Sequence, residues 1–415
     1  MHDLLPLTAR IDGSELVLGG VSATRLVDEH GTPLVVYCEE TIRAQARAYR
    51  EAAPGALLVY GTKAFANVEL LRILAGEGAG ADVSTLGELA FARAAGIPGG
   101  RLLFHGNNKS DEELAAAAQA GAAVVLDAPD EPERAAAAGV RRALVRLLPG
   151  VEAVTHRSIQ TAHDESKFGM PAEAALQAIR DARRLGLDVE GVHFHVGSQL
   201  ARVEESLQAV ERLAAFCGRA REELDWSPRL LDIGGGLGIR YTREDSVPGI
   251  AEFVAPLVGR LRELWPHEVQ IVLEPGRSLV GRAGVTLYRV GVVKSSGGVT
   301  FAAIDGGMSD NPRPQLYAAR YEALLANRAD ELADGVFRIA GKHCETGDVL
   351  IEAAELPHPR RGDLLAVPAT GAYTLAMGST YNGVPRPAVV VVRDGEARLV
   401  RRRESTDELL RYEES

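Results

Sequence analysis

A lysine follows a short apolar, strand-like run in the first quarter of the chain. Residues 57–60 are Leu-Leu-Val-Tyr, and Lys63 comes three residues later. A lysine at the tip of a buried strand can point into a pocket, lose its proton and become an amine nucleophile able to form a Schiff base. A lysine in this position is more often a solvated loop residue. The interpretation as a nucleophile therefore depends on which other groups the sequence supplies.

A run of three glycines, Gly234-Gly235-Gly236, follows the strand-like segment 230–233. Glycines let backbone N–H groups approach an anion closely, so the run could cradle a phosphate. A dinucleotide-binding fingerprint is excluded by spacing, because Ile239 occupies the position where the third glycine of that fingerprint belongs. A flexible turn remains the alternative interpretation.

The run Glu274-Pro275-Gly276-Arg277 stands at the end of the strand-like segment 271–274. A buried carboxylate there could pair with a pyridinium nitrogen and keep it protonated. Arg277 could bind a phosphate or a carboxylate through two hydrogen bonds. A structural Glu–Arg pair is the alternative.

Two histidines, His193 and His195, are two residues apart and share one face of a strand. A zinc site would need further ligands, and no third ligand stands out in the sequence, so no metal is expected. The preferred interpretation is an imidazole stacked on a flat cofactor, with Ser198 available for the cofactor's phosphate.

The C-terminal third of the chain adds polar groups of a different kind. A cysteine beside a carboxylate, Cys344-Glu345, can donate a proton to a carbanion, although a lone cysteine is normally a small apolar filler. Arg313 and Tyr317 are at i, i+4 and would suit a substrate carboxylate if they share a helix face. Tyr373 could bring a phenol to a cofactor or simply pack in a core. Together with Lys63, these groups suit a pyridoxal-phosphate site.

Alternating strands and helices must position these residues. The apolar runs predict eight strands at 57–60, 81–83, 102–105, 123–126, 143–147, 191–195, 230–233 and 271–274. Amphipathic segments such as 68–77, 86–95 and 111–120 lie between them. Eight strand–helix units over about 250 residues are typical of a closed parallel (β/α)8 TIM barrel, with an open doubly wound sheet as the alternative. The polar residues gather where the predicted strands end, which is the catalytic face of such a barrel: Lys63, Asp82, His105, Asp127, Arg146, His195, Gly234 and Glu274.

The segment beyond residue 285 changes character. Strand-like runs at 285–290, 300–304, 336–339, 363–367 and 388–392 are separated by Gly, Pro and Asp turns, which predicts a mostly antiparallel β domain. Residues 16–18 are expected to add a strand to it. The predicted domains are therefore a barrel over 30–280 and a β domain over 1–29 and 281–415.

Composition narrows the functional class. The 415-residue chain has a formal net charge of -11, which argues against nucleic acid as a partner. The sequence has no run of 18 apolar residues, so no membrane span is expected, and the N-terminus lacks the pattern of a signal peptide. The three cysteines, Cys38, Cys217 and Cys344, form no disulfide framework or metal pattern, so a reducing, cytoplasmic location is expected.

Six motifs, taken in order and spacing, resemble the diaminopimelate decarboxylases, a family of alanine-racemase-like (fold type III) pyridoxal-phosphate enzymes. The matching stretches are His105-Gly106-Asn107-Asn108-Lys109-Ser110, His195-Val196-Gly197-Ser198-Gln199, Gly234-Gly235-Gly236, Glu274-Pro275-Gly276-Arg277, Cys344-Glu345-Thr346-Gly347-Asp348 and Gly371-Ala372-Tyr373. The resemblance covers residues 15 to 405, and the form Gly341-Lys342-His343-Cys344-Glu345 is most similar to actinobacterial members. It implies decarboxylation of meso-2,6-diaminopimelate to L-lysine and carbon dioxide.

The resemblance also implies a role for each site residue. Lys63 and Cys344 would be catalytic, the first holding pyridoxal phosphate through a Schiff base and the second returning a proton to the substrate. The implied cofactor contacts are Lys63, Asp82, His195, Ser198, Gly234, Gly235, Gly236, Glu274, Gly276, Arg277 and Tyr373. The implied substrate contacts are Arg277, Arg313, Tyr317, Glu345 and Tyr373. Members of the family are homodimers in which the Cys-Glu loop reaches into the partner's site, so active sites at a dimer interface are implied.

Other functions on the same scaffold stay open. A sister decarboxylase acting on arginine, ornithine or carboxynorspermidine would share the barrel and the cofactor. A non-catalytic binding homologue would be expected to lose the lysine or the cysteine, and both are present. A racemase would normally offer a tyrosine as second base, and no such motif is apparent. Departures from the family at Leu86, 148–150 and 374–380 bear on substrate choice and remove no chemical group that the reaction needs.

Overall fold

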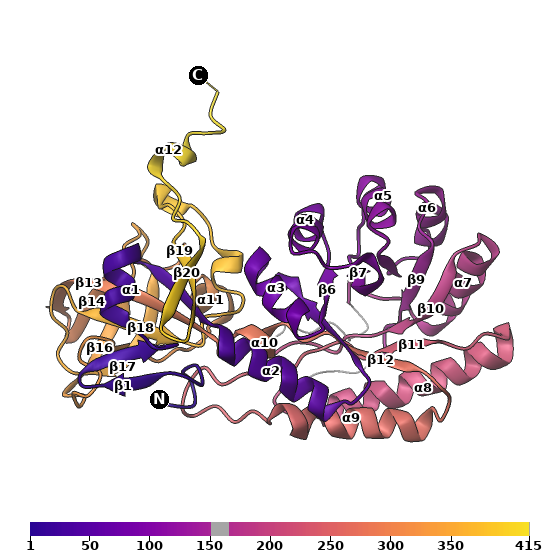
Figure 1. Ribbon diagram of the computed structural model, residues 1–415, viewed down its shortest axis with the longest axis horizontal. Coiled ribbons are helices and arrows are strands. Elements are labelled where there is room, and N and C mark those ends of the chain that lie inside the picture. Colours follow the sequence, from indigo (N-terminus) through magenta and orange to yellow (C-terminus); the bar gives the residue numbers. More distant parts are fainter. Residues whose placement is uncertain (151–165, 415) are drawn as a thin grey trace. The chain divides into compact units, whose positions relative to one another are not determined.

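The computed structural model describes residues 1–150 and 166–414. The chain forms two compact units, each described by itself below (Figure 1). The barrel unit comprises Arg43–Gly238 and Val247–Ser278, and the β unit comprises Met1–Ile42, Ile239–Ser246 and Leu279–Ser415.

Eight parallel strands close the barrel unit. Their order around the barrel is β10-β11-β12-β5-β6-β7-β8-β9, and each neighbouring pair is parallel. The strands are β5 (Leu57–Gly61), β6 (Gly80–Val83), β7 (Leu102–Phe104), β8 (Ala123–Leu126), β9 (Arg142–Arg146), β10 (Asp188–His193), β11 (Leu230–Asp232) and β12 (Gln270–Leu273). All eight predicted strands are confirmed, and the closed barrel excludes the open sheet.

Helices follow the strands along the chain and are labelled in Figure 1. They are α2 (Glu39–Ala52), α3 (Val68–Gly76), α4 (Leu86–Ala94), α5 (Asp111–Ala120), α6 (Glu131–Ala137), α7 (Ala172–Arg184), α8 (Glu204–Leu224), α9 (Ile250–Leu264) and α10 (Arg277–Val280). Local capping explains where several begin. Ser110 and Glu113 form a capping box at α5, and the side chains of Asn67 and Thr85 cap α3 and α4.

The barrel interior is filled by small and branched side chains. Val59, Leu103, Ala123, Val125, Leu144 and Val272 form one buried cluster, contributed by five of the eight strands. Packing of this kind makes the barrel a solid core whose strand ends are held in fixed positions. Polar residues at those ends are therefore presented on a rigid frame.

The β unit is built on a mostly antiparallel sheet. Its strands are β4 (Leu34–Cys38), β13 (Gly284–Ser296), β14 (Val299–Ile304), β15 (Leu324–Leu325), β16 (Gly335–Ala340), β17 (Val349–Leu356), β18 (Leu364–Pro368), β19 (Ala388–Arg393) and β20 (Glu396–Arg401). Two of the neighbouring pairs, β4 with β19 and β14 with β16, are parallel. Three short helices belong to this unit: α1 (Ala23–His30), α11 (Arg313–Tyr317) and α12 (Thr406–Leu409).

The N-terminal segment joins the β unit differently from the prediction. Residues 16–18 do form a strand, β2 (Glu15–Leu18), but it pairs with β1 (Arg10–Asp12) and β3 (Val21–Ser22) in a separate three-stranded sheet. The strand that the segment adds to the large sheet is β4, between β13 and β19. Residues 34–38 are wholly buried and apolar, and such a run does not reveal whether it pairs in a barrel or in an antiparallel sheet.

The boundaries of the units differ accordingly from the predicted 30–280. The β unit extends to Ile42 at its first boundary and takes in Ile239–Ser246 from within the predicted barrel. Across the described residues, every helix is too short or too polar to span a membrane.

Candidate active site

Lys63 lies at the end of its barrel strand, as the sequence predicts. It falls in a single helical turn, Thr62–Ala64, that directly follows β5. The Lys63 ammonium is 3.2 Å from Oδ2 of Asp82, the residue that pairs with Gly61 on the neighbouring strand β6. Asp82 is buried, whereas 54% of the lysine side chain is exposed. The amine is thus anchored by a carboxylate and still accessible to a ligand.

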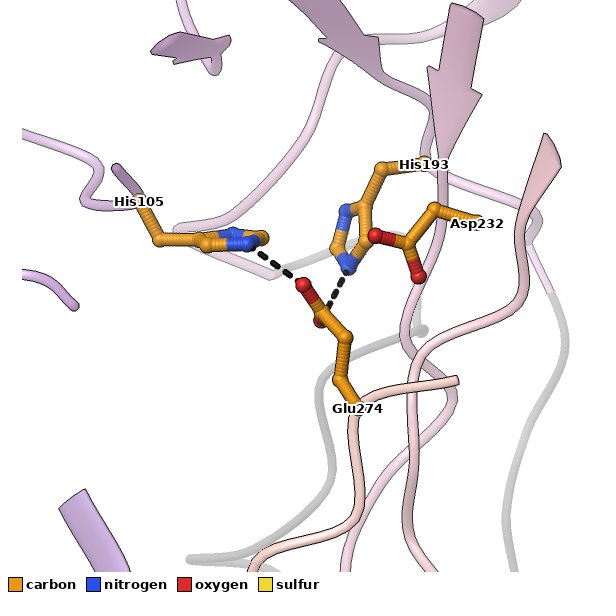
Figure 2. A group of neighbouring side chains, drawn as sticks. All are labelled: His105, His193, Asp232 and Glu274. Atoms are coloured by element: carbon orange, nitrogen blue, oxygen red, sulfur yellow. Dashed lines mark hydrogen bonds and ion pairs between the residues drawn. The ribbon is translucent and has the colours of Figure 1, made fainter. Parts of the chain in front are cut away.

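A second carboxylate, Glu274, is buried at the same end of the barrel between two histidines. His105 Nε2 is 2.7 Å from Glu274 Oε1, and His193 Nε2 is 3.1 Å from Glu274 Oε2 (Figure 2). The two imidazole rings meet edge to face, with their centroids 4.8 Å apart. His193 ends β10 and Glu274 follows β12, while His105 follows β7, three strands away from β12 around the barrel. The closed barrel is what brings the three together.

The histidines hold Glu274 in its ionised form. Burial opposes ionisation, but the interactions of Glu274 with His105 and His193, hydrogen bonds among them, outweigh it and hold the pKa of Glu274 well below its usual range. Burial lowers the pKa of His193 to about 4, so this ring is neutral near pH 7. A carboxylate only accepts hydrogen bonds, so the Nε2 of His193 must carry the proton and donate it. The Glu274 carboxylate therefore has one fixed neutral donor and a second donor at His105.

Asp232 lies beside Glu274, and its surroundings favour the protonated form. It ends β11, is fully buried, and accepts a hydrogen bond from the Gly234 N–H at 2.9 Å. Burial, reinforced by the negative charge of Glu274, raises the pKa of Asp232 well above its usual range. Its Oδ2 has no hydrogen-bond partner among the described residues. Of these two carboxyl groups, Glu274 is therefore the one whose charged form is favoured, and Asp232 the one whose protonated form is favoured.

These four side chains also have the donor types of a metal site. One ligand atom from each of His105, His193, Asp232 and Glu274 lies within 4.8 Å of the others (Figure 2). The sequence analysis paired His193 with His195, but only His193 belongs to this cluster, and its other three members come from three other strand ends. The histidine nitrogens that could bind a metal are nevertheless engaged with Glu274. The cluster is accounted for as a hydrogen-bonded set around one carboxylate.

The glycine run forms a cradle that has no room for side chains. A methyl group on Gly234, Gly235 or Gly236 would lie 2.6, 2.3 and 2.5 Å from backbone oxygens of neighbouring loops. Gly234 and Gly236 also have positive φ values of 64° and 112°. The Gly235 N–H points at His195 Nδ1, 3.4 Å away. The run is therefore a close-packed loop, and the flexible-turn alternative is excluded.

His195 is a neutral ring beside this cradle. Removal from water, together with the positive charges of Lys63 and Arg146, lowers the pKa of His195 well below its usual range. Its Nδ1 faces the Gly235 N–H, which fits an unprotonated nitrogen at that position. A neutral, flat imidazole near the lysine is suited to stacking on an aromatic ring.

Arg277 and Ser198 lie together near the same loops. Arg277 Nη2 donates to Ser198 Oγ at 3.1 Å, and 7% of the arginine is exposed. The segment that carries Gly276 and Arg277 is fixed against the end of β5, because Pro275 accepts a hydrogen bond from the Gly61 N–H at 3.2 Å. A structural pair between Glu274 and Arg277 is not what the structure shows, since Glu274 pairs with the two histidines.

The β unit carries the remaining predicted residues. Cys344 and Glu345 lie on an exposed loop, so the cysteine is not an apolar filler. The loop is anchored by the buried Asp348, which accepts hydrogen bonds from the backbone and Nδ1 of His343 at 2.9 and 2.6 Å. Asp348 also accepts one from the Met308 N–H at 2.7 Å. The exposed tip therefore projects from a rigid base.

Arg313, Tyr317 and Tyr373 are also in the β unit. Arg313 and Tyr317 are the first and last residues of helix α11, which confirms the predicted helical spacing. Arg313 is buried with 5% of its surface exposed, so surface placement is excluded for it. Tyr373 is partly exposed and has a positive φ of 58°, which is uncommon outside glycine and is found preferentially at functional sites.

Three groups in these clusters escaped the sequence analysis. Asp232 carried a usable signal, because it ends a barrel strand directly before the glycine run. Tyr241 and Tyr321, which pack on Arg313, carried none. His193 was noticed only as a metal candidate.

The barrel-end residues fit pyridoxal phosphate on structural grounds. The cofactor needs an amine, an anionic partner for its ring nitrogen, a flat surface and donors for phosphate. The structure provides Lys63, the ionised Glu274, the neutral His195 and a glycine cradle that any Cβ would fill.

Comparison with known proteins gives the same answer. The sequence model described as "Pyridoxal-dependent decarboxylase, pyridoxal binding domain" matches residues 39–281. The chain is 46% identical to a diaminopimelate decarboxylase of Actinosynnema pretiosum subsp. auranticum, over 99% of this chain and 95% of that protein. It is 41% identical to a diaminopimelate decarboxylase of Bacillus subtilis, over 96% and 95% of the two chains.

A solved structure shares the complete fold. The diaminopimelate decarboxylase of M. jannaschii, in co-complex with L-lysine, aligns with a TM-score of 0.91 at 30% identity over 98% of both chains. The barrel, the cofactor-type site and the full-length similarity together show that this chain belongs to the diaminopimelate decarboxylase family of pyridoxal-dependent decarboxylases.

Proposed function

We propose that this protein decarboxylates meso-2,6-diaminopimelate to L-lysine and carbon dioxide, with pyridoxal phosphate as its cofactor. The observation that carries the proposal is the buried, ionised Glu274 at the same barrel end as the accessible amine of Lys63. Full-length similarity to proteins of that name supports the choice of substrate.

Bound pyridoxal phosphate supplies an electron sink for the electron pair that carbon dioxide leaves behind on Cα. Lys63 would hold the cofactor through its amine, which Asp82 anchors. Glu274 would pair with the ring nitrogen and keep it protonated, and the imidazole of His195 would offer a flat surface for the cofactor ring. Lys63, Glu274 and His195 would therefore set the position of pyridoxal phosphate and the protonation of its ring nitrogen.

The remaining cofactor contacts are donors for phosphate. Backbone N–H groups of Gly234, Gly235 and Gly236, the hydroxyl of Ser198 and the guanidinium of Arg277 supply hydrogen bonds, and Gly276 lets that segment pass close by. Asp82 orients the Lys63 amine through the 3.2 Å contact. Tyr373 contributes a phenol to cofactor and substrate.

The substrate contacts are proposed from the β unit and from Arg277. Arg277, Arg313 and Tyr317 bind substrate carboxylate, and Glu345 binds the distal amine. The Cα–carboxylate bond breaks, and a proton from Cys344 or from water replaces the carbon dioxide on Cα. The exposure of Cys344 and its anchored loop support a role at a site completed by a second copy of the chain.

A homodimer is therefore part of the proposal. Mixing inactive Lys63→Ala protein with inactive Cys344→Ala protein should recover part of the activity, because one site of each mixed dimer would then be intact. No recovery, with exchange of subunits verified by mass, would contradict the shared site. The three unpaired cysteines support a reducing, cytoplasmic location.

The test of function is release of lysine and carbon dioxide from meso-diaminopimelate by the purified protein with pyridoxal phosphate. Ornithine, arginine and carboxynorspermidine serve as competing substrates. Turnover of diaminopimelate alone supports the proposal, and turnover of another amino acid instead would reassign the substrate while keeping the cofactor chemistry. Lys63→Ala should lose the visible band of the bound cofactor and nearly all turnover.

A further inference from the structure

Arg313 is enclosed by two aromatic rings within the β unit. Its Cζ lies 4.2 Å from the ring centroid of Tyr241 and 5.6 Å from that of Tyr321. Arg313 Nη1 donates to the hydroxyl of Tyr321 at 2.5 Å. The two tyrosine rings meet edge to face, with their centroids 5.4 Å apart. We call Tyr241 and Tyr321 the aromatic cage.

Arg313 has no carboxylate partner among the described residues, although it is buried. Two other buried cations do have one: Lys109 is 2.9 Å from Glu131, and Arg146 is 3.1 Å from Asp127. The Arg313 Nε likewise has no hydrogen-bond acceptor in the described part of the chain. Burying a cation without a counter-ion is costly. A guanidinium kept in this state is prepared to bind an anion that comes from outside the chain.

The cage explains how the charge is tolerated. The faces of aromatic rings attract a cation without neutralising it, and the attraction strengthens when water is excluded. Burial opposes the charge, but the phenol groups of Tyr241 and Tyr321 prevail and raise the pKa of Arg313 above its usual value. A carboxylate in place of either ring would have satisfied the guanidinium and removed its need for a ligand.

We propose that Tyr241 and Tyr321 are positioning residues that hold the Arg313 guanidinium in a fixed orientation, so that the enzyme selects substrates with a second carboxylate. This inference rests on the proposed function. Diaminopimelate keeps one carboxylate after the other is lost, whereas ornithine and arginine have only the one that reacts. The Arg313 guanidinium, which has no counter-ion among the described residues, favours binding of substrates that bring a second carboxylate. Substrates without one, such as ornithine and arginine, would leave this buried cation unpaired and bind more weakly.

Tyr241 lies close in sequence to the glycine run of the proposed cofactor site. Tyr241 comes three residues after Gly238, yet it packs in the core of the β unit with Ile239 and Tyr321. The glycine run of the barrel unit and one wall of the cage are therefore adjacent along the chain.

The test compares Tyr241→Leu and Tyr321→Phe with the native enzyme, using kcat and KM for meso-diaminopimelate. Tyr241→Leu removes one ring face, and Tyr321→Phe keeps its ring and removes the hydroxyl that accepts from Arg313. We expect KM to rise roughly tenfold for Tyr241→Leu and several-fold for Tyr321→Phe, with kcat nearly unchanged, since the loss is one of substrate binding. Calorimetric binding of pimelate, a seven-carbon dicarboxylate without amines, should weaken by the same factors.

Phe337→Leu is the matched control, because Phe337 packs in the same buried core without contacting Arg313. Its KM and pimelate affinity should match those of the native enzyme. Unchanged KM in both cage variants, or an equal rise in Phe337→Leu, would overturn the proposal in favour of a purely structural role. If Tyr241→Leu does not fold, Tyr321→Phe alone decides. A native enzyme inactive on diaminopimelate would instead refute the proposed function and leave pimelate binding to judge the cage.

Discussion

The support that His193 gives to Glu274 can be tested directly by removing the N–H group that His193 donates to the carboxylate. His193 is 1% exposed, and its Nε2 lies 3.1 Å from the Glu274 carboxylate. His193→Leu fills a similar volume with no polar atom, whereas His193→Gln keeps an N–H that can donate. The pair of variants therefore separates loss of the hydrogen bond from loss of packing.

The expected magnitude follows from the kind of bond that is lost. A hydrogen bond to a charged group contributes about 1.5–3 kcal/mol, more than one between neutral groups. In His193→Leu the Glu274 carboxylate keeps only His105 as a hydrogen-bonded donor among the described histidines, and its charged form is destabilised accordingly. If the cofactor requires the ionised form, a loss of about 2 kcal/mol raises the pKa of Glu274 by about 1.5 units and weakens cofactor binding by up to about 30-fold at pH values where the variant's Glu274 is protonated.

The assay is equilibrium titration of the apoprotein with pyridoxal phosphate at several pH values, followed by the visible absorbance of the complex. His193→Leu should bind up to about 30-fold more weakly at acidic pH, where its Glu274 is protonated more readily than that of the native protein, if about 2 kcal/mol is lost. The deficit should shrink at higher pH, where Glu274 ionises without help, and His193→Gln should recover most of the affinity. Native affinity in His193→Leu, or an equal loss in both variants, would refute the reasoning that the hydrogen bond matters.

Three further outcomes are expected. Asp232→Asn should have no effect on the melting temperature near pH 4 and should raise it above that of the native protein increasingly from pH 5 to pH 8. The reason is that the raised folded-state pKa of Asp232 makes the stability of the native protein fall as the pH rises above the unfolded pKa of about 3.9. A gain in melting temperature that is independent of pH would contradict this. Gly235→Ala should lose cofactor affinity at an added packing cost of about 1–3 kcal/mol, because its Cβ would lie 2.3 Å from the backbone oxygen of Glu274; unchanged affinity in a cofactor titration would contradict the cradle. Asp348→Ala should lower kcat while leaving cofactor affinity intact, because it frees the base of the Cys344 loop; a native kcat in the same assay would show that the loop needs no anchor.

The barrel was predictable because its sequence signals are local. Each buried run, such as 123–126, is bounded by a helix with its own start signal, as Ser110 and Glu113 show for α5. Eight such units permit few other arrangements. The pairing of β4 was not predictable, because a five-residue apolar run carries no mark of its partners, and those partners lie about 250 and 350 residues further along the chain.

The site was predictable only in part, and chemistry explains the difference. Lys63, Glu274 and the glycine run have residue types that are unusual where they stand, at the ends of apolar strands. Asp232 stands at such an end too, but its proton depends on the neighbouring charge of Glu274, which no single segment of sequence shows. The role of a titratable group is set by its neighbours in space.

Charge placement distinguishes the proposed cofactor site from the proposed site for the substrate's second carboxylate. At the barrel end, the anionic Glu274 has hydrogen bonds with two histidines, and the protonated form of the neighbouring Asp232 is favoured. The charge of Glu274 is therefore stabilised within the protein, and this carboxylate is a defined partner for a ring nitrogen. In the β unit, Arg313 is held by rings that leave its charge uncompensated among the described residues. The first arrangement suits a resident cofactor, and the second suits a ligand that must arrive and depart. That contrast is the physical reason to assign the cofactor to the barrel strand ends and the selective carboxylate to Arg313.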